Sequence, residues 1–314
     1  MSDAAAIPSP IKKWLLATRP WALPASTMPV IFGTSLAVVV GRARLDPLRF
    51  LLALLAMMVL HSAANMMSDV FDFRRGLDTF VTPVSGAIVR GWLTAKQVAA
   101  GSVVLFVVGI GLGLGLAALT GAVLLIIGSV GVLIGAGYTL LKYHALGDLA
   151  VFLNFGILGG LGAWVVQTRE FSWIPVFWTV PMAMLVSAIP HANNWRDTVS
   201  DSERRVRTFA SILGDKGSSA YYSFLVFGSM AIIFGLILLP RLLSPKLVPM
   251  PWTFVVVLLA LPRALQLWGR ATRRHVPRRP MDFIILDGAT ANYNLIFGLL
   301  CTAALWLEQV LKLN

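Results

Sequence analysis

Long apolar runs, separated by short polar and turn-rich segments, constrain this 314-residue chain more than any other feature. A helix needs roughly 20 consecutive apolar residues to cross the hydrocarbon core of a bilayer. Hydrophobic residues make up 57% of the chain and charged residues only 13%, whereas about 25% of a soluble globular protein is charged. These proportions exclude a soluble fold and intrinsic disorder, and they predict an all-α, polytopic membrane protein.

The apolar runs predict nine transmembrane helices and no soluble domain, so that residues 1–314 form a single transmembrane domain. The predicted spans cover residues 22–40, 48–67, 97–117, 121–139, 147–167, 173–192, 219–239, 252–269 and 287–309. An odd number of spans puts the two ends of the chain on opposite sides of the membrane. We expect a helical bundle around a central cavity that opens to the cytoplasmic side.

The net charge of +12 comes from basic residues in the predicted loops. With nine spans, 19 of the 26 Lys and Arg residues fall on the side of the N-terminus and 7 on the other side. Because cytoplasmic loops are enriched in Lys and Arg, this asymmetry predicts a cytoplasmic N-terminus and a multi-pass protein of the inner membrane. The basic residues are scattered over short loops, which argues against nucleic-acid binding. No obligate protein partner is evident.

Six of the 14 acidic residues lie in two short segments that directly follow the second and sixth predicted spans. They are Asp69, Asp72 and Asp78 in the first segment, and Asp197, Asp201 and Glu203 in the second. An asparagine precedes the aspartates of each segment, with spacings of i, i+4, i+7 from Asn65 and i, i+3, i+7 from Asn194. Each trio therefore shares one helix face if the helix continues beyond its apolar run. The two segments lie on the same predicted side of the membrane.

Clustered carboxylates in a membrane protein need a compensating positive charge. Two carboxylates about 5 Å apart repel each other by about 3 kcal/mol at an effective dielectric constant near 20. Oxygen ligands without a partnering Cys or His favour Mg²⁺, which binds through one or two carboxylates, waters and phosphate oxygens. The pattern predicts two facing helix ends that hold a diphosphate through bridging Mg²⁺. Nearby basic residues could neutralise the diphosphate directly; these are Arg75, Arg90, Lys142, Arg196 and Arg207.

At these residues the sequence resembles the UbiA superfamily of intramembrane prenyltransferases, which have nine helices and two aspartate-rich motifs. Within it, the motifs resemble the branch of 1,4-dihydroxy-2-naphthoate polyprenyltransferases, which act in menaquinone synthesis. The strings that carry the resemblance are RPWALPASTMPVIFGT at 19–34, NMMSDVFDFRRGLD at 65–78, YTLLKYHALGDL at 138–149 and NNWRDTVSDSERRVRT at 193–208. The two aspartate motifs, in this order and spacing, are the specific part.

The resemblance implies a set of roles for these residues. The catalytic residues that bind the Mg²⁺–diphosphate would be Asp69, Asp72, Asp197 and Asp201. Asp78 matches the G-x-D ending of the naphthoate branch and would be a further metal ligand. Asn65 and Asn194 would support the aspartates, and Lys142 would contact the diphosphate. The substrates would be a polyprenyl diphosphate and an aromatic acceptor, most simply 1,4-dihydroxy-2-naphthoate, which would lose carbon dioxide. Ser68 departs from the family, which usually has Asn at this position.

Further expectations concern the surroundings of the site. An allylic cation needs protection from water, and aromatic side chains could line its pocket and offer π-faces to it; the candidates are Phe71, Phe73, Tyr138, Tyr143 and Trp164. His61 and His191 lie near the ends of the second and sixth spans, where packing or hydrogen bonding is a commoner role than catalysis. The glycines within 109–115 and 128–137 predict close helix packing.

Other functions stay open on the sequence alone. The acids could form ordinary interfacial salt bridges, although two clusters of the same pattern argue against this. A proton-coupled transporter also uses intramembrane acids, but it predicts acids near the middle of a span. A related prenyltransferase could use 4-hydroxybenzoate, a tetrapyrrole or a glycerol phosphate lipid as its acceptor. A phosphatidyl-alcohol transferase would carry a D-G-x-x-A-R motif, which the chain lacks.

Overall fold

The computed structural model describes residues 8–77, 81, 86–204, 206–243, 248–275 and 283–313, and in these ranges it contains helices and no strand. The helices are α1 (Pro10–Ala17), η1 (Pro20–Ala22), α2 (Pro24–Val39), α3 (Pro47–Arg74), α4 (Ala95–Thr120), α5 (Ala122–Ala136), α6 (Tyr138–Tyr143), α7 (Gly147–Val151), η2 (Phe152–Leu158), α8 (Gly159–Thr168), α9 (Trp173–Trp178), α10 (Val180–Arg196), α11 (Thr198–Glu203), α12 (Phe209–Leu243), η3 (Trp252–Ala260), α13 (Leu261–Ala271) and α14 (Leu286–Leu313). The predicted all-α class is confirmed.

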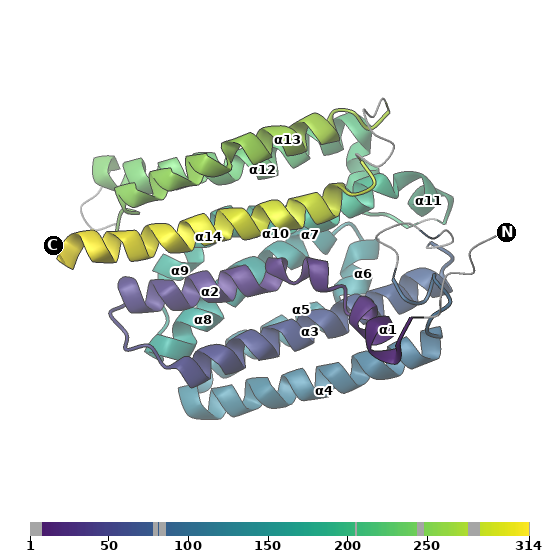
Figure 1. Ribbon diagram of the computed structural model, residues 1–314, viewed down its shortest axis with the longest axis horizontal. Coiled ribbons are helices and arrows are strands. Elements are labelled where there is room, and N and C mark those ends of the chain that lie inside the picture. The colour runs from purple at the N-terminus through teal and green to yellow at the C-terminus, as the bar shows by residue number, and fades with distance from the viewer. Residues whose placement is uncertain are drawn as a thin grey trace.

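The long helices run side by side along the longest axis of the molecule, with α1 towards one end of the bundle and the C-terminal end of α14 at the other (Figure 1). Within the described residues, six helical segments are long and apolar enough to cross a membrane, and a seventh is added if α1–η1 and α2, bent by 59°, count as one span. Each of the nine predicted ranges overlaps a helix, but α5 has only 15 residues and reaches about 22 Å. The count of nine therefore stays a prediction.

The main apolar core lies where α2, α8, α10, α12, η3 and α14 meet. Phe254 packs edge-on against Phe32 and Trp178, with ring centroids 6.2 and 6.0 Å away. Helices α2 and α8 approach closely at two glycines, because a Cβ on Gly33 would collide with the backbone of Gly160. This core holds α10, which carries the second aspartate motif, rigidly within the bundle.

The prediction of close helix packing is wrong for four of the glycines of α4 and α5, but it holds at Gly109, where a Cβ would collide with Leu60 of α3. A Cβ added at Gly111, Gly113, Gly115 or Gly128 would meet no heavy atom within 4 Å. Gly113 and Gly128 instead line an apolar cavity. Because glycine has no side chain, these positions leave open space between the helices.

Three elements bring the predicted site residues to one end of the bundle. The C-terminal end of α3 carries the first motif, α6 carries Lys142, and the junction of α10 and α11 carries the second motif. Figure 1 shows the end of α3, α6 and α11 at the same end of the molecule as the N-terminus. The two motifs therefore face the same side of the bundle, as the sequence predicted.

Candidate active site

The first motif lies on the last three turns of α3, where the helix continues beyond its apolar run. Asp72 is buried and its two carboxylate oxygens have different donors. Lys142 Nζ lies 2.9 Å from Oδ2, and the Tyr143 hydroxyl donates to Oδ1 at 2.8 Å. Ser68, one turn before Asp72, donates a longer hydrogen bond of 3.5 Å to Oδ2. One carboxylate thus joins α3 to two consecutive residues of α6.

Asp69 of the same motif pairs with Arg19, which lies between α1 and η1. The guanidinium forms a salt bridge with Oδ1, and Nε donates to Oδ2 at 3.3 Å. Arg19 adopts a left-handed backbone conformation, with φ of 52°, which is uncommon for a residue other than glycine. Gly86 lies directly against the other side of the carboxylate, where a Cβ would collide with Asp69 Oδ2. The string that begins at Arg19 therefore belongs to the site, a role that the sequence did not reveal.

The second motif begins where α10 ends. The Arg196 guanidinium donates two hydrogen bonds to Asp197, each 2.9 Å long, and a third to Asn193 Oδ1 at 2.6 Å. It also reaches Asp287 Oδ2 on α14 at 3.3 Å. The predicted basic partner Arg196 thus holds its neighbouring aspartate and ties the motif to α14.

Asp201, on α11, is buried and accepts a weak hydrogen bond of 3.5 Å from Thr208. The pKa of its carboxyl is raised to about 7, and burial is the largest cause. The charge of Lys142 lowers this pKa, whereas the carboxylates of Asp197 and Asp72 raise it. Burial also opposes a positive charge on Lys142, yet its pKa is raised because the Asp72 carboxylate stabilises the ammonium. Lys142 therefore lies within electrostatic reach of both motifs.

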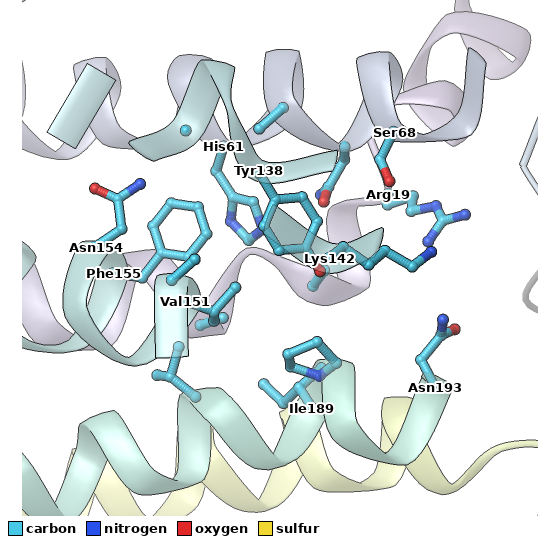
Figure 2. A pocket seen from close by; sticks show the side chains of 18 of the residues that line it. Arg19, His61, Ser68, Tyr138, Lys142, Val151, Asn154, Phe155, Ile189 and Asn193 are labelled. Atoms are coloured by element: carbon cyan, nitrogen blue, oxygen red, sulfur yellow. The ribbon is translucent and has the colours of Figure 1, made fainter. Parts of the chain in front are cut away.

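A cavity of about 100 Å³ lies between these elements, lined on its polar side by Arg19, Asn65, Asp72, Lys142, Asn193 and Asp287. Figure 2 shows Arg19, Ser68 and Lys142 at one end of the cavity and Val151, Asn154 and Phe155 at the other, with His61 and Tyr138 between them. The cavity therefore has a charged end beside the first motif and an apolar end deeper in the bundle.

Several other predicted site residues do not line this cavity. Arg75 stacks over the Tyr143 ring at 4.2 Å, Arg90 over the Trp92 ring at 5.3 Å, and the backbone of Arg207 pairs with His144. Asn194 is buried, and its neighbour Asn193 borders the cavity instead. Asp78 lies outside the described residues.

The donor groups fit a magnesium ion that shares its coordination with a diphosphate. Among the described residues, no group of three His, Cys, Asp or Glu side chains lies close enough together to hold a metal ion by itself. Mg²⁺ needs only one or two carboxylates when phosphate oxygens and waters complete its shell. Asn65 Nδ2 is buried at the cavity and has no hydrogen-bond partner among the described residues. Such an amide is suited to donate to an anionic oxygen.

Comparisons with known proteins show which family the chain belongs to. Residues 26–286 match the UbiA prenyltransferase family. The chain belongs to this family. It is 32% identical to 1,4-dihydroxy-2-naphthoate octaprenyltransferase of Bacillus subtilis (strain 168) over 302 residues, which cover 93% of this chain and 91% of that protein.

Two further relatives extend the comparison. A UbiA prenyltransferase domain-containing protein 1 homolog of Drosophila melanogaster is 31% identical, over 94% of this chain and 79% of that protein. The structure of a UbiA homolog from Archaeoglobus fulgidus bound to GPP and Mg²⁺ has the same fold, with a TM-score of 0.62 at 12% identity over 93% of this chain and 99% of that one. The protein is thus a membrane prenyltransferase.

In this UbiA-family enzyme the polar cavity shares part of its wall with a larger apolar cavity. The apolar cavity has a volume of about 420 Å³ and lies among α2, α3, α4, α5, η2 and α8. Ala64, Gly135, Asn154 and Phe155 line both cavities. Asn154 and Phe155 lie on η2, a π-helical segment in the middle of the span Gly147–Thr168. Such segments are frequent at functional sites, because the wider turn redirects side chains.

The aromatic lining differs from the prediction. Phe71 and Phe73 are exposed on α3, and Trp164 donates from Nε1 to the carbonyl of Glu170, away from the site. The prediction was wrong for these three residues, because the face of α3 that carries Asp69 and Asp72 turns Phe71 and Phe73 outward. Tyr138 does line the cavity, and it is joined there by Trp21 and Phe155.

The sequence also gave no indication of a buried pair formed by Asp148 and His191 beside the site. Asp148 Oδ2 lies 2.7 Å from His191 Nδ1 and joins α7 to α10, while Ser187 donates to the carbonyl of Asp148 at 3.0 Å. A Cβ on Gly147 would press against Lys142, 3.0 Å from its Cα. The G-D pair after Lys142 thus fixes α7 against both α6 and α10. The spacing of this pair along the sequence gives no sign that Asp148 and His191 meet.

Proposed function

We propose that this enzyme transfers a polyprenyl group from an allylic prenyl diphosphate to 1,4-dihydroxy-2-naphthoate, with loss of carbon dioxide, in the inner membrane of a cell. The observation that carries the proposal is a charged cavity, bordered by Asp72 and Lys142, that lies directly beside an apolar cavity about four times as large and shares four lining residues with it. A diphosphate head and a long apolar tail need this combination. We further propose nine spans and a cytoplasmic N-terminus.

The charged end binds the diphosphate in this proposal. Lys142 and the Asn65 amide donate to its oxygens, and the aspartates of both motifs hold it through Mg²⁺; these are Asp69, Asp72, Asp197 and Asp201, with Asp78 as a further candidate. Magnesium, when bound, offsets the negative charge that builds up on the leaving diphosphate as the C–O bond breaks. Lys142 supplies a positive charge in a site of low dielectric, where it acts more strongly than it would in water.

The remaining basic residues support this end of the cavity. Arg19 orients Asp69 by its salt bridge. Arg196 does the same for Asp197 through two hydrogen bonds. We propose that Arg75, Arg90 and Arg207, together with Arg196, attract the anionic head at the mouth of the site, and that Asn194 supports the second motif from within α10.

The apolar cavity holds the isoprenoid tail. The polar cavity has a volume of only about 100 Å³, so a polyprenyl chain must extend into the space of about 420 Å³ beyond it. Its walls carry glycines in place of larger side chains, among them Gly113 and Gly128. The allylic cation forms where the two cavities join, shielded from water by Tyr138 and Phe155, whose rings offer it π-faces.

The identity of the acceptor rests on the 32% identity to the Bacillus enzyme. Purified protein in detergent or vesicles, given Mg²⁺ and a radiolabelled prenyl diphosphate, tests it with a panel of aromatic acceptors. We expect a decarboxylated prenyl naphthalenediol from 1,4-dihydroxy-2-naphthoate and little product from 4-hydroxybenzoate. Faster transfer to 4-hydroxybenzoate would refute the proposed identity of the acceptor but would still support prenyl transfer. Movement of a solute without consumption of prenyl diphosphate would favour a transporter.

The position of the tail has its own test. Gly113→Leu should lower kcat/KM for a long polyprenyl diphosphate by about 10-fold or more, because the new side chain fills the tail cavity, and it should leave a ten-carbon donor unaffected. Gly111→Leu is the matched control, since Gly111 lies on the same helix outside the cavity lining and has open space around it. Equal effects of the two variants would refute this position for the tail.

A further inference from the structure

His61 lies on the cavity side of α3, one helical turn before Asn65 and therefore about 6 Å deeper in the bundle. Its side chain is buried and lines the same cavity as Asp72 and Lys142. Figure 2 shows it between the charged end of the cavity and the apolar end, beside Tyr138. The imidazole is thus placed beyond the diphosphate-binding end, at the depth where the allylic carbon and the acceptor ring would meet.

The hydrogen bonds around His61 determine which ring nitrogen carries the proton. His61 Nδ1 lies 2.8 Å from the Ser26 hydroxyl oxygen. Ser26 has a single hydroxyl hydrogen, which it donates to the carbonyl of Leu23 at 3.1 Å. With that hydrogen bond made, Ser26 accepts one from His61, and this arrangement favours the tautomer in which Nδ1 carries the hydrogen. In the neutral ring this leaves Nε2 as a hydrogen-bond acceptor.

The other ring nitrogen, Nε2, belongs to a side chain that lines the cavity, and it makes no hydrogen bond to a described residue. The ring itself is held in place, because it packs against Phe155 with centroids 4.3 Å apart. His191 differs in its surroundings: its Nδ1 pairs with Asp148, its Nε2 is buried without a partner among the described residues, and its side chain does not line the cavity. A fixed tautomer with a free acceptor on a substrate cavity instead suits a ligand that donates a hydrogen bond.

We propose that His61 Nε2 accepts a hydrogen bond from a ring hydroxyl of the aromatic acceptor and takes its proton during prenyl transfer; this rests on the proposed function. An electron pair of the ring forms the bond to the allylic carbon, whose C–O bond has broken with the pair leaving on the diphosphate. The hydroxyl O–H bond breaks, its proton moves to Nε2, and its electron pair forms a C=O bond.

Aromaticity returns in a second step. The attacked carbon loses carbon dioxide, and the electrons of that C–C bond restore the ring. The carbonyl oxygen then takes the proton back from His61, so that the histidine ends neutral as it began. No oxidant or reductant is consumed. An acceptor without a carboxylate at this carbon would lose a proton from it instead.

The test compares an acceptor that has a free ring hydroxyl with its O-methyl ether, in the wild-type enzyme and in His61→Phe. The phenylalanine ring preserves the packing against Phe155 but accepts no proton. A positioned general base contributes about 100-fold or more to the rate, so we expect His61→Phe to lower kcat for the hydroxyl acceptor by at least that factor. Transfer to the methyl ether should be slow and equal in the two proteins, because it offers no proton to His61.

Binding of Mg²⁺ and an unreactive prenyl thiodiphosphate should change less than threefold in His61→Phe, since the donor site lies on the charged end. If His61→Phe loses this binding, the rates with the hydroxyl acceptor and with its methyl ether are compared in His61→Gln instead. His275→Phe, at an exposed histidine paired with Asp215, is the control and should keep wild-type rates.

Three results separate the outcomes. Equal losses for the hydroxyl acceptor and its ether, or an undiminished rate for the hydroxyl acceptor, would overturn the role of His61 and leave the proposed function standing. A wild-type enzyme that prenylates no ring acceptor at all would overturn the proposed function and the role of His61 together. A loss confined to the hydroxyl acceptor supports both.

Discussion

The two aspartate motifs look alike in sequence but differ in how the protein neutralises them. In the first motif, Asp69 pairs with Arg19 and Asp72 with Lys142, so that each carboxylate takes a cation from an element distant in sequence. In the second, Asp197 pairs with its own neighbour Arg196. Asp201 has no salt bridge to any described residue. The first motif is thus built into the tertiary structure, whereas the second is neutralised locally and leaves one carboxyl uncompensated.

This difference teaches that a repeated pattern of carboxylates need not repeat a structural role. Removing one partner of a buried ion pair leaves an uncompensated charge in a medium of low dielectric and costs about 3–5 kcal/mol. That cost applies to the Lys142–Asp72 pair, whose side chains are each 9% exposed. It applies less to Arg196 and Asp197, which are 16% and 32% exposed. We expect catalysis to need both motifs and stability to depend mainly on the first.

The largest expected effect is on catalysis. Asp72→Asn and Asp197→Asn should each lower kcat by at least about 100-fold, because each removes a negative ligand that helps to stabilise the leaving diphosphate. The measurement is transfer from a prenyl diphosphate at saturating Mg²⁺, with equal amounts of folded protein. Near-normal turnover in either variant would remove that motif from the site.

A difference in stability should separate the two motifs. Asp72→Asn leaves Lys142 buried without its counter-ion and should lower the free energy of unfolding by about 3–5 kcal/mol, while Asp197→Asn should lower it by about 1 kcal/mol or less. Thermal unfolding in detergent without Mg²⁺ compares them. The double variant Asp72→Asn, Lys142→Met should recover most of the lost stability and none of the activity. Similar losses in the two single variants would contradict the contrast between the motifs.

The smallest expected effect depends on pH. The pKa of Asp201 is raised to about 7 from its ordinary value of 3.8, so between these values the folded protein holds a proton that the unfolded chain releases. Stability from this group is therefore lost as pH rises towards 7. Asp201→Asn cannot ionise, so its melting temperature in the absence of Mg²⁺ should exceed that of the wild type by a few degrees more at pH 7 than at pH 5. A gap that narrows with rising pH would refute this.

Much of this architecture can be predicted from sequence, because hydropathy and the 3.6-residue period are local properties. They predicted the helical class and ranges that each overlap a helix of the structure, whereas the count of nine spans stays a prediction. Contacts between distant segments cannot be predicted in this way. The pairing of Arg19 with Asp69 spans 50 residues and that of Lys142 with Asp72 spans 70. The sequence offered Lys142 as a partner of the diphosphate but not of Asp72, and nothing local pointed to the contact between Arg19 and Asp69.

The prediction of close helix packing at four of the glycines of α4 and α5 failed for a related reason. Small residues at regular spacing allow helices to approach closely, but they equally allow a cavity when the neighbouring helix stays away. Local spacing does not distinguish the two outcomes, and the distance between helices is set by packing elsewhere in the bundle. The tail cavity therefore emerges only in three dimensions.

The central claim is that both aspartate motifs bind the same diphosphate through Mg²⁺. Isothermal titration of the purified protein with an unreactive prenyl thiodiphosphate tests it most directly, with and without Mg²⁺, in the wild type, Asp72→Asn and Asp197→Asn. We expect tight binding that requires Mg²⁺ and is weakened at least about 10-fold by either substitution. Binding that persists without Mg²⁺, or that is unchanged in one of the two variants, would contradict the account.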